Sequence, residues 1–138
     1  MIKLFKKNEK FSLNGNVFKF FDNNFIGNIK EVYFSAIKYK KVKGWKQNNS
    51  IDQFLYVIQG SVKFIIYQEK KKKIYSISLG HNHKYSKIII KKNDWYAFQG
   101  LSKKNLIASA LKKLHKNCIF KSLNLKNDLI PYKWNKKN

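Results

Sequence analysis

Residues 43–48 form the stretch whose residue types could do chemistry, because Lys43 and Lys46 flank a Gly-Trp pair and two amides follow. A lysine amine can meet a phosphate as a point charge. It can also act as a base, provided that desolvation or a neighbouring cation lowers its pKa from about 10.4. An apolar run over residues 54–67 follows and is broken only at Gln59-Gly60. In a β-barrel, this order predicts a polar cluster at the barrel mouth, with two core strands joined by a tight turn behind it.

The sequence predicts a series of short strands as the elements that must position these residues. Runs rich in β-branched and aromatic residues are separated by turn signals rich in Gly, Asn and Asp. We expect strands over residues 17–21, 29–38, 54–59, 61–67, 73–79, 87–91, 95–98, 106–111 and 118–122. Val62, Phe64 and Ile66 should share one face of their strand, and the residues between them the other. Many short strands at this spacing favour a sandwich or barrel, for which the double-sheeted jelly roll is one solution.

The size and composition of the chain bound its class. It has 138 residues, of which 43% are hydrophobic, so residues 1–138 can form one compact domain. Cys118 stands alone, which excludes a disulfide within the chain. The basic start lacks the apolar core of a secretory signal, and no stretch approaches the ~18–20 apolar residues of a membrane span. We therefore expect a single-domain, cytoplasmic protein without a membrane span.

A formal net charge of +23 would ordinarily suggest a nucleic-acid partner. All 30 basic residues are lysines, however, and the abundance of lysine, asparagine and isoleucine is typical of an AT-rich coding sequence. Nucleic-acid binders usually exploit the planar fork of arginine. The lysines are also scattered, and their one dense run, residues 70–73, coincides with an expected hairpin turn. We expect no nucleic-acid partner.

Five segments occur in an order typical of one family. They are Ile29-Lys30-Glu31-Val32-Tyr33-Phe34-Ser35, Lys43-Gly44-Trp45-Lys46, Gly60-Ser61-Val62-Lys63-Phe64, Trp95-Tyr96-Ala97-Phe98-Gln99-Gly100-Leu101-Ser102 and Ile130-Pro131-Tyr132-Lys133-Trp134. Over about residues 15–134, the chain resembles the cupin family related to dTDP-4-dehydrorhamnose 3,5-epimerase, in particular its shorter branch with Gly-Trp-(His or Lys) and Ile-Pro-Tyr-x-Trp motifs. The resemblance implies an all-β fold, a double-stranded β-helix or jelly-roll cupin. It also implies a homodimer, with N-terminal strands from residues 1–27 at the interface.

The same resemblance implies a reaction. The substrate would be a nucleotide-linked 4-keto-6-deoxy sugar used in the synthesis of surface polysaccharide or lipopolysaccharide. Its keto group acidifies the protons on C3 and C5, so a base can remove one of them and an acid can return a proton on the opposite face. The intermediate enolate also needs a group that stabilises its oxygen.

The family's functional positions can be carried over to this chain. Lys46 stands where the family has its histidine base, and Gln53 where a lysine supports the keto oxygen. Tyr96 replaces the histidine of a His-Gly-Phe segment and is our candidate acid, because the family's own tyrosine acid falls near Ser109. Further expected substrate contacts are Lys43 for a diphosphate, Trp45, Tyr56, Trp95 and Phe98 for stacking on a sugar or base, and Asn48 and Ser109. Aromatic residues on barrel strands more often belong simply to the core, so this alternative stays open for the four rings.

A metal site has little support in the sequence. Cupins often bind metal through His-x-His, Glu and a later His, whereas this chain offers Lys46, Asn48 and Asp52. His81 and His83 have His-x-His spacing, but they fall in an expected loop. We expect no metal and no other cofactor. Since all three catalytic positions are altered, two functions stay open: an epimerase-like enzyme, or a binding module that retains a sugar-nucleotide or carbohydrate pocket.

Overall fold

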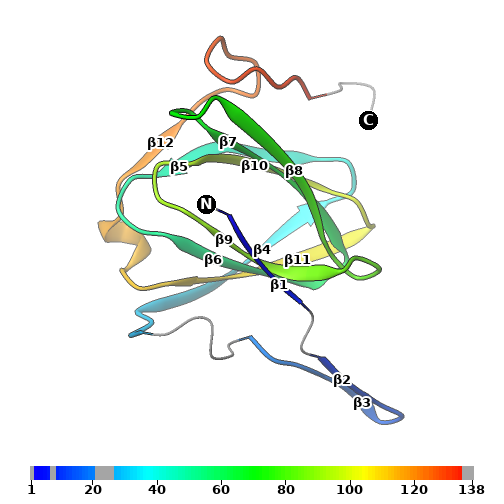
Figure 1. The fold of residues 1–138 in the computed structure, drawn as a ribbon. Coiled ribbons are helices and arrows are strands. Elements are labelled where there is room, and N and C mark those ends of the chain that lie inside the picture. The colour runs from blue at the N-terminus through cyan, green and yellow to red at the C-terminus, as the bar shows by residue number, and fades with distance from the viewer. Residues whose placement is uncertain (1, 7–8, 21–26, 135–138) are drawn as a thin grey trace.

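The computed structural model describes residues 2–6, 9–20 and 27–134, and within them two five-stranded sheets face each other (Figure 1). The first sheet has the strand order β1 (Lys3–Lys6), β9 (Tyr85–Ile90), β6 (Gln53–Gln59), β11 (Lys104–Leu111) and β4 (Glu31–Lys38). The second sheet has the order β12 (Phe120–Ser122), β5 (Val42–Asn48), β10 (Trp95–Gly100), β7 (Ser61–Gln68) and β8 (Lys73–Gly80). A hairpin of β2 (Glu9–Ser12) and β3 (Gly15–Phe18) projects away from both sheets, and a 3₁₀ turn, η1 (His115–Asn117), precedes β12. The predicted all-β class is confirmed.

The strands predicted from apolar runs are observed with small shifts at their ends. The strand expected over residues 17–21 corresponds to β3, which ends at Phe18, and Phe21 lies outside the described residues. The predicted turn at Gly60 joins β6 to β7, and this glycine has a φ of 76°. β1 and β2 lie in the segment 1–27, for which N-terminal strands were expected without bounds, and β5 was not predicted. For β5 the difference matters, because residues 43–48, expected as a polar cluster at the barrel mouth, form part of a sheet.

A β-bulge in β5 explains why its sequence does not alternate like a strand. On the neighbouring strand β10, Tyr96 pairs with Lys46 and Ala97 pairs with Gly44. No residue of β10 is therefore paired with Trp45. A bulge inserts one residue and thereby changes which side chains share a face. As a result Lys43 and Lys46 both line the space between the sheets, although they are three residues apart. A regular strand would place them on opposite faces.

The core between the sheets contains the apolar side chains that the alternation in β7 predicts. Val62, Phe64 and Ile66 are fully buried there, together with side chains of β6, β9 and β11. The alternate residues Ile65 and Tyr67 belong to a separate cluster on the outer face of the second sheet, which confirms the predicted two-faced strand. Burial of each such side chain contributes about 1.5–3 kcal/mol.

The outer face of the second sheet is covered by the C-terminal segment. Trp45, fully buried, packs against Tyr132 and Trp134 with ring-centroid distances of 6.3 Å in both cases. The backbone of Trp45 also exchanges two hydrogen bonds with Leu123, of 3.2 and 3.1 Å. In Figure 1 this segment runs over the outside of the second sheet. The Ile-Pro-Tyr-x-Trp motif therefore anchors the bulge from outside.

We predict that Gly44→Ala destabilises the protein strongly. A Cβ at Gly44 would lie 2.6 Å from the Cβ of Ala97 and 2.8 Å from the backbone oxygen of Tyr96, at a φ of 128°. Gly15→Ala is the matched control, because Gly15 has a φ of 136° but no atom of the described residues lies within 4 Å of the added methyl. In urea denaturation, Gly44→Ala should lower the free energy of unfolding by about 1–3 kcal/mol more than Gly15→Ala does. Equal losses would contradict the close approach of β5 to β10.

Candidate active site

A cavity of about 160 Å³ lies between the two sheets. It is lined by Tyr33 and Ser35 of β4, Lys43, Gly44 and Lys46 of β5, Gln53 and Leu55 of β6, Tyr96 and Phe98 of β10, Ile107 and Ser109 of β11, and His115 of η1. A cavity needs only ~10–15 Å³ to hold one water, so this one has room for a small ligand group. Leu55 and Ile107 also belong to the core between the sheets, so the cavity is continuous with the core.

The structure brings the three candidate catalytic residues to this one cavity. Lys46 and Tyr96 are paired across β5 and β10 in the second sheet. Gln53, the first residue of β6, belongs to the facing sheet. The expected contacts Lys43, Phe98 and Ser109 also line the cavity.

Four other expected contacts do not line it. Trp45 and Trp95 point to the outer face of the second sheet and belong to its apolar cluster. Tyr56 lies in the apolar cluster on the outer face of the first sheet. Asn48 accepts hydrogen bonds from the backbone of Ser50 and Ile51, at 2.8 and 3.1 Å, and so closes a turn. Placing these four residues at the cavity was wrong, because the bulge and the strand alternation turn the three aromatic rings outward and the amide of Asn48 is engaged in its turn.

Three polar residues of the cavity were missed. Tyr33 and Ser35 lie on β4 and point inward by alternation, a signal that was present in the sequence. His115 follows β11 in a segment without periodicity, so no pattern placed it near the cavity. Its ring packs edge-on against Tyr33, at 5.5 Å and 84°, and stacks on Phe120 at 4.8 Å.

Gln53 is the most unusual polar group of the cavity. Its side chain is 1% exposed, and no hydrogen bond of good geometry reaches its Oε1 or Nε2 from the described residues, although its amide lies close enough to the phenols of Tyr33 and Tyr96 to oppose the rise of their pKa. A buried polar group without a partner costs about 1–3 kcal/mol. The amide is therefore available for a ligand that enters the cavity.

Burial raises the pKa of both cavity tyrosines above the ordinary value. For Tyr96 the pKa is raised strongly, first by burial and then by the nearby Tyr33, while the Gln53 amide opposes the shift. Burial likewise raises the pKa of Tyr33, against the opposing effects of Ser109 and Gln53. Both phenols therefore keep their protons at neutral pH and can act as proton or hydrogen-bond donors.

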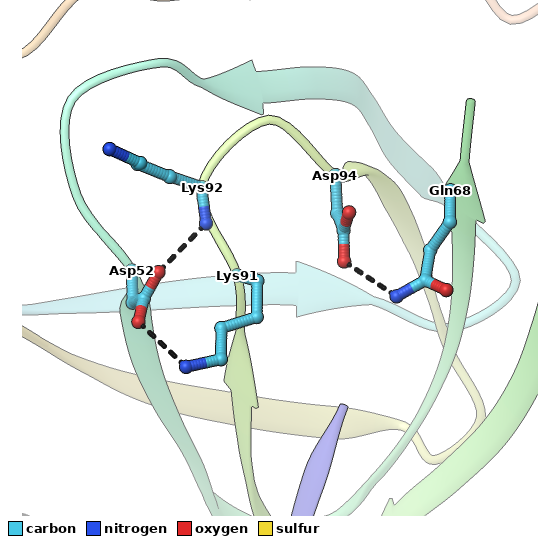
Figure 2. A network of polar contacts seen from close by, with 5 residues as sticks. All are labelled: Asp52, Gln68, Lys91, Lys92 and Asp94. Carbon is cyan, nitrogen blue, oxygen red and sulfur yellow. Dashed lines mark hydrogen bonds and ion pairs between the residues drawn. The ribbon is translucent and has the colours of Figure 1, made fainter. Parts of the chain in front are cut away.

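A carboxylate anchors the start of the strand that carries Gln53. Figure 2 shows the two contacts of Asp52. Its carboxylate accepts a hydrogen bond of 2.9 Å from the backbone N–H of Lys92, and it forms an ion pair of 3.2 Å with the Nζ of Lys91. A half-exposed pair of this kind contributes no more than about 1 kcal/mol. Its main effect is to fix the beginning of β6 against the end of β9.

A second carboxylate lies just before the strand that carries Tyr96. Asp94 accepts a hydrogen bond of 3.1 Å from Gln68 of β7 (Figure 2). Burial raises the pKa of Asp94, although its bond to Gln68 opposes the shift. Each of the strands that carry Gln53 and Tyr96, β6 and β10, is therefore held at its start by the polar contacts of an aspartate.

The described residues bring together no group of three or more His, Cys, Asp or Glu side chains that could hold a metal ion. In the same part of the chain, no helix has the length and apolar character needed to cross a membrane.

Sheet order and cavity position define a jelly-roll cupin with its pocket between the two sheets. Solved structures of sugar-nucleotide enzymes share this fold. A dTDP-sugar isomerase from Desulfovibrio desulfuricans G20 matches with a TM-score of 0.89 at 21% identity, over 96% of this chain and 90% of that one. A dTDP-6-deoxy-D-glucose-3,5-epimerase from Legionella pneumophila, in complex with dTDP-4-keto-L-rhamnose, matches with a TM-score of 0.76 at 13% identity, over 96% of this chain and 78% of that one.

A sugar 3,4-ketoisomerase from Thermoanaerobacterium thermosaccharolyticum, in complex with TDP, gives a TM-score of 0.67 at 18% identity, over 86% of each chain. No family model matches the sequence, and no curated protein does. At these identities the likeness shows the fold, which is that of the dTDP-4-dehydrorhamnose 3,5-epimerases and related sugar isomerases. The predicted cupin fold is confirmed.

We predict that Gln53→Met raises stability by about 1 kcal/mol, because the substitution removes two buried polar atoms that lack partners. Gln47→Met is the matched control. Gln47 is 5% exposed, donates to the backbone oxygen of Asn93 at 2.7 Å and accepts from Asn49 at 2.8 Å. Its replacement should cost about 1–3 kcal/mol. Urea denaturation of both variants checks the prediction, and a loss of stability in Gln53→Met would contradict it.

Proposed function

We propose that this chain is an epimerase-like cupin that transfers protons next to the keto group of a nucleotide-linked 4-keto-6-deoxy sugar. The observation that carries the proposal is the cavity itself, where a lysine, a protonated tyrosine and an unpaired buried amide line one space. This set contains a group for each requirement of enolate chemistry. The fold is shared with enzymes named for the epimerisation or isomerisation of such sugars, which adds support.

In the proposed reaction, Lys46 is the base, Tyr96 the acid and Gln53 the group that polarises the keto oxygen. Lys46 takes a proton from the ring carbon beside the carbonyl, and the C–H electron pair moves to form an enolate. Gln53 donates a hydrogen bond to the enolate oxygen, a role for which its unpaired Nε2 is suited. Tyr96 returns a proton to carbon.

Substrate binding in this proposal uses the remaining cavity residues. Lys43 supplies positive charge for a diphosphate, and Phe98 and Ser109 contact the sugar. Lys43 already reaches from the second sheet to the edge of the first, where its Nζ donates to the backbone oxygen of Ala36 at 2.6 Å. We place this activity in the cytoplasmic synthesis of surface-polysaccharide or lipopolysaccharide sugars, without cofactor or nucleic acid.

A binding module is the second candidate function. Lys46 is exposed, so the open cavity does not provide the desolvation on which a lysine base depends. A cupin that has lost the catalytic set would bind the sugar nucleotide without turning it over.

We predict that the protein, incubated with dTDP-4-keto-6-deoxyglucose in deuterated water, incorporates deuterium at C3 or C5. Lys46→Met should reduce this incorporation by at least a hundredfold, the usual contribution of a general base. Its affinity for the nucleotide sugar, followed by thermal shift, should change far less. Lys73→Met, on the β7–β8 hairpin, should behave as wild type. Binding without any deuterium uptake in the wild-type protein would exclude the enzyme and favour the binding module.

We also propose a homodimer. β4 presents Val32 and Phe34 on the outer face of the first sheet with 43% and 60% of their surfaces exposed. The projecting β2–β3 hairpin exposes Leu13, Val17 and Phe18. Two apolar surfaces of this kind are unusual on a monomer and suit burial against a second copy.

Phe34→Lys should therefore convert a dimer into a monomer, because it places a charge in the proposed interface. Leu129→Lys is the control. Leu129 is exposed too, with 40% of its surface accessible, but it lies in the C-terminal segment over the second sheet. Light scattering coupled to size exclusion gives the masses. A monomeric wild-type protein, with a mass near 16.5 kDa, would contradict the proposal.

A further inference from the structure

The direction of the Lys46 side chain is not set by contacts of its own amine. Lys43, the other lysine of the cavity, has its Nζ tied to the backbone oxygen of Ala36 on the first sheet, at 2.6 Å. Within the described residues, the amine of Lys46 makes no hydrogen bond or ion pair of this kind. Lys46 therefore faces the cavity because the backbone of β5 turns it there.

The backbone of β5 turns Lys46 inward only because of the bulge at Trp45. In a regular strand Lys43 and Lys46 would lie on opposite faces, because side chains alternate with a period of two. β10 pairs with the residues on both sides of Trp45 but not with Trp45 itself. The bulged residue therefore has to be held by something other than β10.

The C-terminal strap, defined as residues 123–134, supplies the contacts that hold Trp45. Leu123 and Trp45 exchange two backbone hydrogen bonds, of 3.2 and 3.1 Å. The fully buried ring of Trp45 has the rings of Tyr132 and Trp134 beside it, each at a centroid distance of 6.3 Å. The bulge is thus fixed at its backbone by one end of the strap and at its side chain by the other.

The far end of the strap is itself anchored away from β5. Tyr132 and Trp134 pack edge-on at 5.0 Å, and the Nζ of Lys63 on β7 lies 5.8 and 5.9 Å from the centroids of these two rings. Ile130, which is buried, belongs to the same outer cluster. Because β10 separates β7 from β5 in the sheet, the strap holds Trp45 from a fixed point on another strand.

Ring packing, rather than hydrogen bonding, makes the contact between the strap and the Trp45 side chain. The Nε1 atoms of Trp45 and Trp134 are buried and have no hydrogen-bond partner in the described part of the chain. Trp134→Phe should therefore keep the contact, since the N–H that it removes has no acceptor. A side chain without a ring at this position would uncover Trp45 and loosen the bulge.

We propose that Trp134 is a positioning residue, which acts through Trp45 to keep Lys46 directed into the cavity. This inference rests on the proposed function, in which Lys46 is the base. A base must lie within hydrogen-bond reach of the proton that it removes, and a displacement of about 1 Å can cost about a hundredfold in rate. Because Lys43 has its own contact with Ala36, the loss should fall on proton transfer rather than on binding of the diphosphate.

The test measures deuterium uptake from deuterated water into dTDP-4-keto-6-deoxyglucose, as kcat and KM, for wild type, Trp134→Ala, Trp134→Leu and Trp134→Phe. We expect kcat to fall by about tenfold to a hundredfold in Trp134→Ala, to fall less in Trp134→Leu, and to stay near wild type in Trp134→Phe. The affinity for dTDP, followed by thermal shift, should change by less than about threefold, because Lys43 is still in place.

Ile74→Ala is the matched control. Ile74 packs against the same outer cluster, but it lies on β8, at the opposite end of the second sheet from β5. Its truncation removes apolar contacts from the cluster without touching Trp45, so kcat should match wild type. An equal loss of kcat in Ile74→Ala would show a general effect of the cluster and overturn the inference.

A double variant shows whether Trp134 acts through Lys46. In a Lys46→Met background, Trp134→Ala should lower the residual deuterium uptake by no more than about twofold, whereas an independent structural effect would add in full. Wild-type kcat in Trp134→Ala and Trp134→Leu, or additive losses in the double variant, would overturn this inference and leave the proposed function standing. A wild-type protein that takes up no deuterium would overturn both.

Discussion

Gly44 packs against Ala97 with no side chain between them, and this contact determines what faces the cavity. The close approach lets β5 bulge at Trp45 while the strand stays paired to β10 on both sides of the bulge. Trp45 then points outward, where Tyr132 and Trp134 cover it, and Lys43 and Lys46 point inward. The outer aromatic cluster and the inner polar cavity are therefore two sides of one local distortion.

The cavity carries polar groups that the fold does not satisfy, and the surrounding clusters offset their cost. Gln53 is buried without a partner, and burial raises the pKa of Tyr33 and Tyr96. The Gln53 amide works against stability, whereas burial keeps both phenols protonated as donors. Apolar clusters lie between the sheets and on the outer face of each one, so the strands that carry the cavity residues are held from both sides. Such a conflict between local and global preferences is typical of functional sites.

Strands with clear apolar runs could be predicted from the sequence, because alternation reports which face of a strand is buried. The two faces of β7 follow directly from Val62, Phe64 and Ile66. β5 could not be predicted in this way: its bulge breaks the period of two, and its exposed lysines hide the pattern. Placing Trp45 and Trp95 at the cavity failed for a related reason, since residue type alone does not tell inner from outer aromatic side chains. His115 reaches the cavity through tertiary packing on Tyr33 and Phe120, which no local pattern encodes.

Charge gives the cavity its polarity. Its described lining includes Lys43, Lys46 and His115 but no carboxylate, whereas Asp52 and Asp94 are engaged in the turns outside it. An enolate and a diphosphate are both anions, and both are stabilised by fixed positive groups and by amide donors such as Gln53. The high lysine content of the chain does not by itself indicate a ligand, because most of these lysines are dispersed over the surface. The functional information lies in the two lysines, Lys43 and Lys46, that the bulge directs into a cavity whose described lining has no carboxylate.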